Sequence, residues 1–443
     1  MTAASNSLTA PPLAWWKRAS ASDYVHKVGQ TYAVQLIIVA LQLITTVISS
    51  RALGPTGRGT YAVAVALGTL GVRFTTLGLH ASNTYYVAKR RELLPSMAGN
   101  TLVYSGSAGG LAALALWGLF QVFPGLAPLH GSMLALALMW IPFGLAYLLC
   151  QNLLIGIGEI RLYNATELVS KIVVVALVVA IVLLRFITPQ TIFIIGLIVL
   201  AGSLATVLVS LRRLCAGRFA WSLSLVHDTV KVGFRAYLIS FFGFLVLRLD
   251  LLMVQKMLGS YQSGDYSIAS TMADAVYILP TVFAAILFPK VCAIHDVRQR
   301  LHATRKASLA VAALLVPLAI GASFLAVPAV RVIFGTPFSG AAPAFIWLMP
   351  GIVFLGVEAV AVQFLNSFGF PISVIVIWVF STVLNVVLNL WAIPAYGING
   401  AAAVSSLTYI TTSLFIFAVI VRTWKSANLG TLAKRVQDQA ISP

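Results

Sequence analysis

Charged residues are scarce in this chain of 443 residues. Asp, Glu, Lys and Arg make up 9% of it, against about 25% in an ordinary soluble domain, and 60% of the residues are hydrophobic. So few charges cannot cover a water-exposed surface, and a mean hydropathy of +0.96 excludes a soluble globular enzyme. Disorder is excluded too, because it requires low hydrophobicity and high charge. The composition predicts an all-α polytopic membrane protein.

Cysteine and acidic residues are also few. Cys150, Cys215 and Cys292 lie far apart without CxxC spacing, so neither a disulfide framework nor a metal site is expected. The 11 acidic residues leave a net charge of +18, but the basic residues stand in short breaks between apolar runs, which is not the pattern of a nucleic-acid-binding face. Residues 54–60, GPTGRGT, lack the Lys-Ser/Thr of a phosphate loop, and no cofactor is expected.

The apolar residues form runs long enough to cross a bilayer, which takes about 20 residues per helix. The runs are continuously apolar, whereas the strands of a transmembrane barrel alternate. We predict twelve spans, at 28–50, 59–80, 100–123, 132–155, 166–186, 190–211, 232–255, 265–289, 306–328, 342–367, 371–393 and 397–421.

The basic residues predict the orientation of these spans. With the N-terminus inside, twenty of the 29 Lys and Arg residues fall in cytosolic segments and four fall inside spans. The other five, including Arg51 and Arg58, fall in outer loops. Because cytosolic loops of membrane proteins carry this basic excess, we expect both termini in the cytosol.

The longest polar break, at 212–231, lies near the middle of the chain. Its spaced apolar residues, such as Phe219 and Trp221, are typical of a segment on the membrane surface. We therefore predict a cytosolic lead-in at 1–27, a six-helix bundle at 28–211, an interfacial linker at 212–231, a second six-helix bundle at 232–421 and a cytosolic tail at 422–443.

A short signature occurs once in each half, between its first and second spans. Both copies read L-G-x4-G-x-Y and they are 205 residues apart. The glycines are expected to permit a tight turn or close backbone approach, and the tyrosines to anchor the helix at the membrane interface. Six spans per half make this a parallel repeat, as in alternating-access carriers. The residues concerned are Gly54, Gly59 and Tyr61 in the first copy, and Gly259, Gly264 and Tyr266 in the second.

The residues around the repeat resemble a known family. The stretch 51–61, RALGPTGRGTY, is similar to the N-terminal region of the polysaccharide-unit flippases. These are the O-antigen and exopolysaccharide transporters of the multidrug/oligosaccharidyl-lipid/polysaccharide exporter superfamily. In the second half, residues 248–250, 259–266, 279–280, 288–289 and 389–402 resemble the same family.

The resemblance implies two six-helix bundles forming a V around a central cavity. It also implies a function, which is to flip an oligosaccharide unit linked to undecaprenyl pyrophosphate from the inner to the outer leaflet of a bacterial inner membrane. The implied partners are this lipid-linked substrate, the bilayer, H⁺ or Na⁺ as coupling ion, and polysaccharide polymerase and assembly proteins. No enzyme activity is implied. Lipid II flippases usually have fourteen helices, so twelve spans weigh against that branch.

Three arginines inside spans are candidates for binding the pyrophosphate. Ionisable residues within a membrane are costly and are functional candidates by default. A guanidinium fork matches phosphate oxygens and keeps its charge, which suits Arg73, Arg235 and Arg248 to this role.

Three carboxylates inside spans are candidates for a coupling ion or for pairing with the arginines. Asp274 lies at a depth similar to that of Arg248, about 12–14 Å from the outer helix ends, so the two can meet. Glu358 lies with Arg73 in the cytosolic half, where a pair would bridge the two bundles. Asp250 is placed near the outer interface, where water can reach it. The alternative for every pair is a structural role without a ligand.

Uncharged polar residues add weaker candidates for sugar binding. Gln35 and Gln42 share one face of the first span, and Asn385 and Asn389 are one turn apart in the eleventh. The alternative, interhelical hydrogen bonding, is favoured at any single one of these sites.

Two other functions remain open from the residues alone. A drug or cation extruder of the same fold would have a cavity dominated by carboxylates, whereas the spans here hold four basic and three acidic candidates. A membrane-embedded saccharide polymerase or ligase would present a sizeable outer loop, whereas the outer loops here are short.

Overall fold

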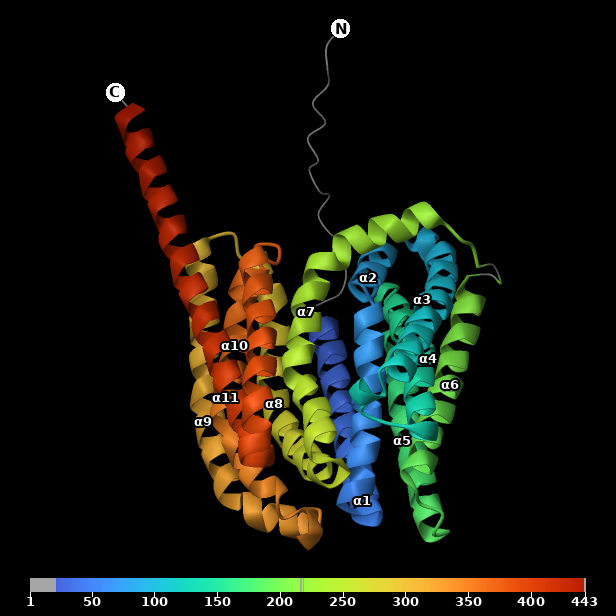
Figure 1. Ribbon diagram of the computed structural model, residues 1–443. Coiled ribbons are helices and arrows are strands. Elements are labelled where there is room, and N and C mark those ends of the chain that lie inside the picture. The colour runs from blue at the N-terminus through green and yellow to red at the C-terminus, as the bar shows by residue number, and fades with distance from the viewer. Residues whose placement is uncertain (1–20, 216, 218, 442–443) are drawn as a thin grey trace.

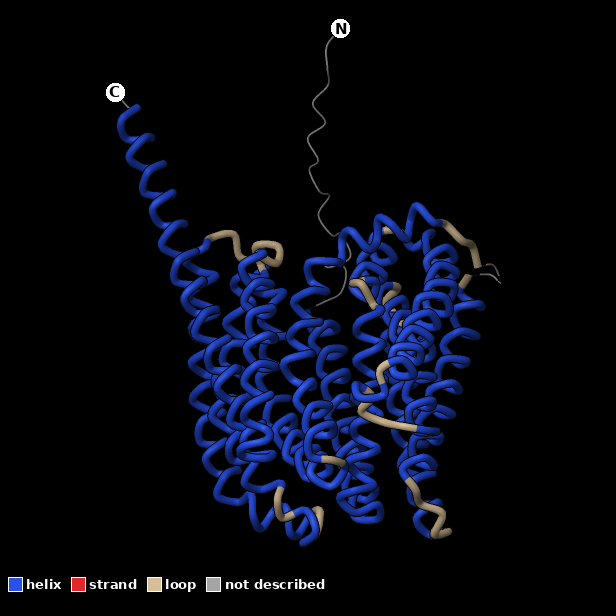
Figure 2. Tube along the Cα trace, viewed as in Figure 1, coloured by secondary structure: helices blue, strands red, loops and turns tan. Residues whose placement is uncertain are grey.

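The computed structural model describes residues 21–215, 217 and 219–441, and throughout this part the secondary structure is helical (Figure 2). The α-helices are α1 (Ala21–Thr75), α2 (Leu79–Lys89), α3 (Leu94–Val122), α4 (Gly131–Gly156), α5 (Ile160–Leu183), α6 (Pro189–Leu214), α7 (Leu223–Leu258), α8 (Ser260–Ala293), α9 (Val297–Ile333), α10 (Ala341–Asn366) and α11 (Ile372–Ile441). Short 3₁₀ turns are η2 (Arg91–Leu93), η3 (Pro124–Leu126) and η4 (Thr336–Phe338). The predicted lead-in lies mostly outside the described residues.

Ten helices in the described part are long and apolar enough to cross a membrane. Two of them, α1 and α11, each join two helices across a kink, at Gly54 and at Gly397. Counting both sides of each kink gives the twelve spans expected from the sequence, with ends that differ from the prediction by several residues. The all-helical fold class is therefore confirmed.

The helices form two bundles that stand side by side (Figure 1). One consists of α1 to α6 and the other of α7 to α11. We call the end where α11 projects beyond the bundles the inner end, after its predicted cytosolic side, and the opposite end the outer end. The contact zone between the bundles is called the seam.

The first glycine of each repeat copy makes a turn that other residues adopt with strain. Gly54 has φ +68° and Gly259 has φ +86°, both in the left-handed range that glycine tolerates. Gly54 kinks α1, and Gly259 separates α7 from α8. The predicted turns are present at both positions.

The second glycine of each copy packs across the seam at the outer end. A Cβ atom on Gly59 would lie 1.9 Å from the Ser260 carbonyl oxygen, and one on Gly264 would lie 2.0 Å from the Pro55 carbonyl oxygen. Pro55 and Ser260 each follow the turn glycine of their own copy, so the two contacts are reciprocal. The repeat thus builds a pseudo-twofold crossing that only glycine permits.

At the inner end, α7 bridges the two bundles. A Cβ atom on Gly78 would lie 2.5 Å from the carbonyl carbon of Gly233. The Tyr237 hydroxyl donates to the carbonyl of Phe74 (2.9 Å), and the Ser82 hydroxyl donates to that of Thr229 (2.5 Å). The seam is consequently closed at its outer end by α1 and α8, and at its inner end along α7.

The linker after α6 packs onto the first bundle. Asn100 of α3 donates to the carbonyl of Ser222 (2.9 Å) and accepts its backbone N–H (2.8 Å). The first turns of α7 then lie across α2 and α3 (Figure 1). Trp221 keeps 52% of its surface exposed, as a membrane-surface segment requires.

Candidate functional site between the two bundles

An ion pair links α7 and α8 within the second bundle. Arg248 Nη2 donates to Asp274 Oδ2 at 2.6 Å, so the geometry fits the predicted pair. The two side chains keep 31% and 38% of their surface exposed although both lie within spans. The pair therefore borders accessible space, from which a ligand could compete for the guanidinium.

Arg73 reaches the same face of α7 from the opposite bundle. Its guanidinium carbon lies 5.7 Å from the centre of the Phe244 ring, a cation–π contact across the seam. Phe244 and Arg248 are one helical turn apart on α7, so they share a face. Arg73 and Arg248, predicted from the sequence as pyrophosphate ligands, are thereby both brought to the seam.

The predicted bridge between Arg73 and Glu358 is not formed. Glu358 of α10 is 2% exposed, and its Oε1 has no hydrogen-bond partner in the described part of the chain. Glu358 faces the interior of its own bundle. Its electrostatic neighbour there is Tyr277 of α8, which also interacts with Asp274.

Asp250 is buried, which corrects its predicted place near water. It is 2% exposed and accepts three hydrogen bonds, from the Leu251 backbone (2.7 Å), the Tyr266 hydroxyl (2.5 Å) and the Ser405 hydroxyl (2.8 Å). These donors come from α7, α8 and α11. The carboxylate joins three helices, and no ion pair engages it in the described chain.

Tyr266 corrects the expectation of an interfacial anchor. Its side chain is fully buried, and its hydroxyl is used by Asp250. Tyr61, its counterpart in the first copy, is half-buried and packs edge-on against Phe193 (6.2 Å). Each ring thus packs within its own bundle, Tyr266 beside Asp250 of α7 and Tyr61 against Phe193 of α6.

The asparagines predicted as sugar ligands lie in the interior of the second bundle. Asn389 donates to Asn385 (3.0 Å), which donates to Thr408 of the same kinked helix (3.5 Å). Both are buried, at 0% and 1% exposure. Asn385 bonds across the Gly397 kink, the alternative that the sequence left open, whereas Asn389 bonds within its own helical segment and its Oδ1 has no partner in the described chain. Gln35, Gln42 and Arg235 are exposed, and their predicted contact with substrate stays a prediction.

Three ionisable residues were missed by sequence reasoning. Asp265 of α8 is 3% exposed, and its Oδ1 has no hydrogen-bond partner in the described chain. Glu167 of α5 accepts from the Tyr147 hydroxyl (2.9 Å) and from Gln151 (2.6 Å), and its position inside a predicted span could have identified it. Arg58 was assigned to a solvated outer loop, yet it is 7% exposed and lies in the seam. Its place directly before a repeat glycine was the available signal.

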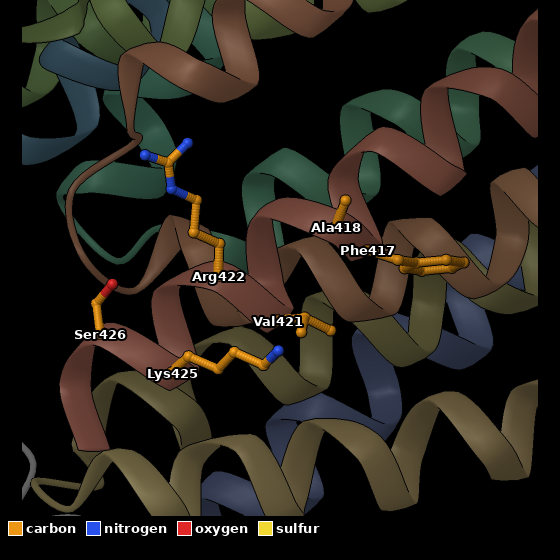
Figure 3. A pocket seen from close by; sticks show the side chains of 6 residues that line it. All are labelled: Phe417, Ala418, Val421, Arg422, Lys425 and Ser426. Atoms are coloured by element: carbon orange, nitrogen blue, oxygen red, sulfur yellow. The ribbon is translucent and has the colours of Figure 1, made fainter. Parts of the chain in front are cut away.

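A separate recess of about 540 Å³ lies on α11 at the inner end (Figure 3). Its lining is Phe417, Ala418, Val421, Arg422, Lys425 and Ser426. All six residues belong to one helix, so the recess is a face of α11 and includes no residue of the seam.

Known proteins share this fold. A family model described as "Polysaccharide biosynthesis protein" matches residues 160–343. A search of curated proteins gives no match. Solved structures of low identity superpose over nearly the whole chain. An inward-facing multidrug resistance MATE family transporter of the MOP superfamily has a TM-score of 0.71 at 14% identity, covering 91% of this chain and 99% of its own.

Two further structures show the same similarity. The lipid II flippase MurJ in an inward closed conformation has a TM-score of 0.66 at 15% identity, with 88% and 87% coverage. The Vibrio cholerae MATE transporter VcmN in its bent form has a TM-score of 0.61 at 15% identity, with 92% and 98% coverage. The family match agrees with the resemblance noted in the sequence over residues 160–343, and the solved structures agree with the fold that it implied. The chain is a multi-pass membrane protein with the fold of the multidrug/oligosaccharidyl-lipid/polysaccharide exporter superfamily, and its central part matches the polysaccharide biosynthesis family.

Proposed function

We propose that the protein flips a lipid-linked oligosaccharide repeat unit from the inner to the outer leaflet of the bacterial inner membrane. The carrier lipid is undecaprenyl pyrophosphate, and the unit is destined for O-antigen or exopolysaccharide. The observation that carries this proposal is that Arg73 of the first bundle packs on Phe244 of α7, one helical turn from Arg248 of the second bundle. Two guanidiniums on neighbouring turns of the seam suit a diphosphate, and the family match at 160–343 supports the saccharide.

The proposed transport cycle is alternating access between the two bundles. The parallel repeat supplies two rigid halves, and the seam is where they part. Both termini face the cytosol in this scheme, in agreement with the basic excess of the inner segments. Polysaccharide polymerase and assembly proteins would take the unit at the outer leaflet.

Arg248 is neutralised by Asp274, and this pairing offers a way to couple transport to an ion. Protonation of Asp274 would release the guanidinium to the diphosphate, and deprotonation would reclaim it. Glu358 supports this scheme, because its buried Oε1 has no hydrogen-bond partner in the described chain and both it and Asp274 interact electrostatically with Tyr277. We assign Glu358 and Asp274 to the coupling proton, with Na⁺ as the other ion to be tested.

Glu358→Gln is expected to abolish the response to a proton gradient. Glutamine keeps the size of the side chain but cannot release a proton. In proteoliposomes, a proton gradient should raise the rate of lipid-linked unit translocation at least tenfold for the native chain and leave the variant unchanged. The control is Glu92→Gln, an exposed carboxylate. A variant that still responds to the gradient contradicts the assignment, and a response to Na⁺ alone identifies the other ion.

The two rival functions make different demands on the seam. A drug or cation extruder needs uncompensated carboxylates there, whereas Asp274 is already paired with an arginine and a second arginine lies nearby. A polymerase or ligase needs catalytic residues on a large outer segment. The described outer connections are short, such as residues 184–188 between α5 and α6.

Loss of the protein tests the proposal directly. In a strain that lacks it, the lipid-linked repeat unit should accumulate in the inner leaflet while surface polysaccharide falls to background. The sidedness is read by oxidising sugars from outside intact spheroplasts, which should leave the accumulated unit intact. If the accumulated unit is oxidised as fully as in the parent strain, the flippase function is wrong. If drug sensitivity rises and the polymer is unaffected, the extruder is favoured.

A further inference from the structure

Arg58 is a buried cation at the outer end of the seam. It comes from α1, and its Nε donates to Ser267 (3.2 Å) and its Nη2 to Thr271 (3.5 Å), both on α8 of the other bundle. Its guanidinium also lies 5.7 Å from the ring centre of Tyr61. All of these partners are neutral. In the described part of the chain, the one ion pair joins Arg248 and Asp274, so no carboxylate compensates Arg58.

Arg51 repeats this pattern on the other side of the Gly54 kink. Its Nε donates to the carbonyl oxygen of Ile333 (2.8 Å), and its Nη2 donates to that of Val332. Two arginines of the first bundle thus bind only neutral acceptors of the second, but Arg51 is exposed and Arg58 alone is buried. A charge removed from water without a counter-charge is unfavourable, and an anion that arrived here would be bound strongly.

The position of Arg58 ties it to opening of the outer end. The guanidinium sits beside the reciprocal crossing of Gly59 and Gly264, which leaves no room for a side chain. Parting the bundles here breaks the bonds to Ser267 and Thr271 and leaves Arg58 facing the gap. The repeat does not supply this cation twice, because the residue equivalent to Arg58 in the second copy is Ser263.

We propose that Arg58 holds the outer end of the seam closed and, when the seam opens, exchanges its two hydroxyl partners for the diphosphate of the cargo. The diphosphate-binding role of Arg58 rests on the proposed function. The ligand class is an anionic prenyl diphosphate, received at the depth of the outer leaflet. Arg73 and Arg248 would bind the same group earlier in its passage.

Cysteine labelling from outside tests the closing role. The three native cysteines are first replaced by alanine, and Ser263→Cys is introduced, because Ser263 is 0% exposed and its Oγ lies 2.5 Å from a Cβ atom placed on Gly59. A membrane-impermeant maleimide should label this cysteine at least tenfold faster when Arg58→Gln is added. Arg58→Lys, which keeps the charge but loses the fork, should give an intermediate rate.

Two controls keep this test decisive. Tyr261→Cys, at a residue that is 49% exposed in the same outer region, should be labelled at one rate with or without Arg58→Gln, which shows that the variant is folded and inserted. Arg331→Gln removes an exposed arginine from the same end of the molecule and should not accelerate labelling at position 263. Equal labelling of position 263 with and without Arg58 overturns the closing role.

Farnesyl pyrophosphate serves as a soluble probe of the diphosphate role. It should accelerate labelling at position 263 at least threefold when Arg58 is present and have no effect after Arg58→Gln, whereas farnesol should have none in either protein. Inorganic pyrophosphate shows whether the diphosphate suffices without the prenyl chain. If farnesyl pyrophosphate leaves the rate unchanged in the protein that retains Arg58, the diphosphate role is wrong.

The closing role of Arg58 and the proposed flippase function can each fail without the other. The closing role is measured without cargo, so its failure leaves the accumulation experiment in the null strain unaffected. Conversely, a null strain without accumulation would refute the cargo and leave the labelling result valid.

Discussion

Replacing Arg248 by alanine is expected to lower surface polysaccharide at least tenfold while the protein still inserts at its normal level. A hydrogen bond from a charged donor contributes about 1.5–3 kcal/mol, which corresponds to roughly 10- to 150-fold in affinity for the diphosphate. Arg73→Ala should have a similar effect, because Arg73 reaches the same face of α7 from the other bundle. Polymer is quantified on intact cells, and protein by immunoblot of washed membranes.

The ion pair with Asp274 allows anchoring to be separated from packing. Arg248→Ala leaves Asp274 as an unpaired carboxylate within a span, and this alone could disturb the bundle. The double variant Arg248→Ala/Asp274→Ala removes both charges. If the pair only stabilises helix packing, the double variant should regain polymer; if Arg248 binds the cargo, it should remain defective. Arg331→Ala, an exposed arginine of α9, is the matched control and should leave polymer unchanged.

The sequence predicts positions along each helix better than directions around it. The span count follows from hydropathy, and the turns at Gly54 and Gly259 follow from the repeat, because both are local properties of the chain. The Arg248–Asp274 pair could also be predicted from the sequence, because α7 and α8 are consecutive helices joined by a single-residue turn at Gly259. Their relative depth is therefore fixed by residue number alone.

Contacts between helices that are far apart in the sequence could not be predicted in this way. Arg73 and Glu358 were predicted to pair, but Glu358 of α10 has Tyr277 as its electrostatic neighbour and Arg73 packs on Phe244 of α7. Arg58 looked like a loop residue because a basic residue between two spans usually faces water. Its burial depends on the crossing of Gly59 with Ser260, a contact between residues 201 positions apart that no local pattern encodes.

Asp250 shows how a residue can lie near a helix end and still be enclosed. It was expected to be solvated because it lies only two turns before the end of α7. The structure covers it with Tyr266, the tyrosine of the second repeat copy, and with Ser405 from α11. The resemblance had already marked residues 248–250 and 259–266 together, and their hydrogen bond is a physical reason for that joint pattern.

Asp250→Ala is accordingly expected to destabilise the second bundle and not merely to slow transport. The change removes two hydrogen bonds between helices, each contributing about 0.6–1.7 kcal/mol, so the free energy of unfolding should fall by about 1–3 kcal/mol. It also leaves the Tyr266 and Ser405 hydroxyls buried without an acceptor. Thermal unfolding of the purified protein in detergent should therefore begin at a lower temperature, and less protein should reach the membrane.

Asp250→Asn and Ser405→Ala make the test specific. Both hydroxyls donate to Oδ2, so an amide oxygen at that position keeps both bonds, and the asparagine leaves only the Leu251 N–H without its acceptor. It should therefore lose less stability than alanine, while Ser405→Ala removes only one of the three bonds and should lose least. This order follows from the number of donors left unpaired. A stable Asp250→Ala protein that has lost transport would contradict it, because such a protein would need the carboxylate for an ion and not for joining α7, α8 and α11.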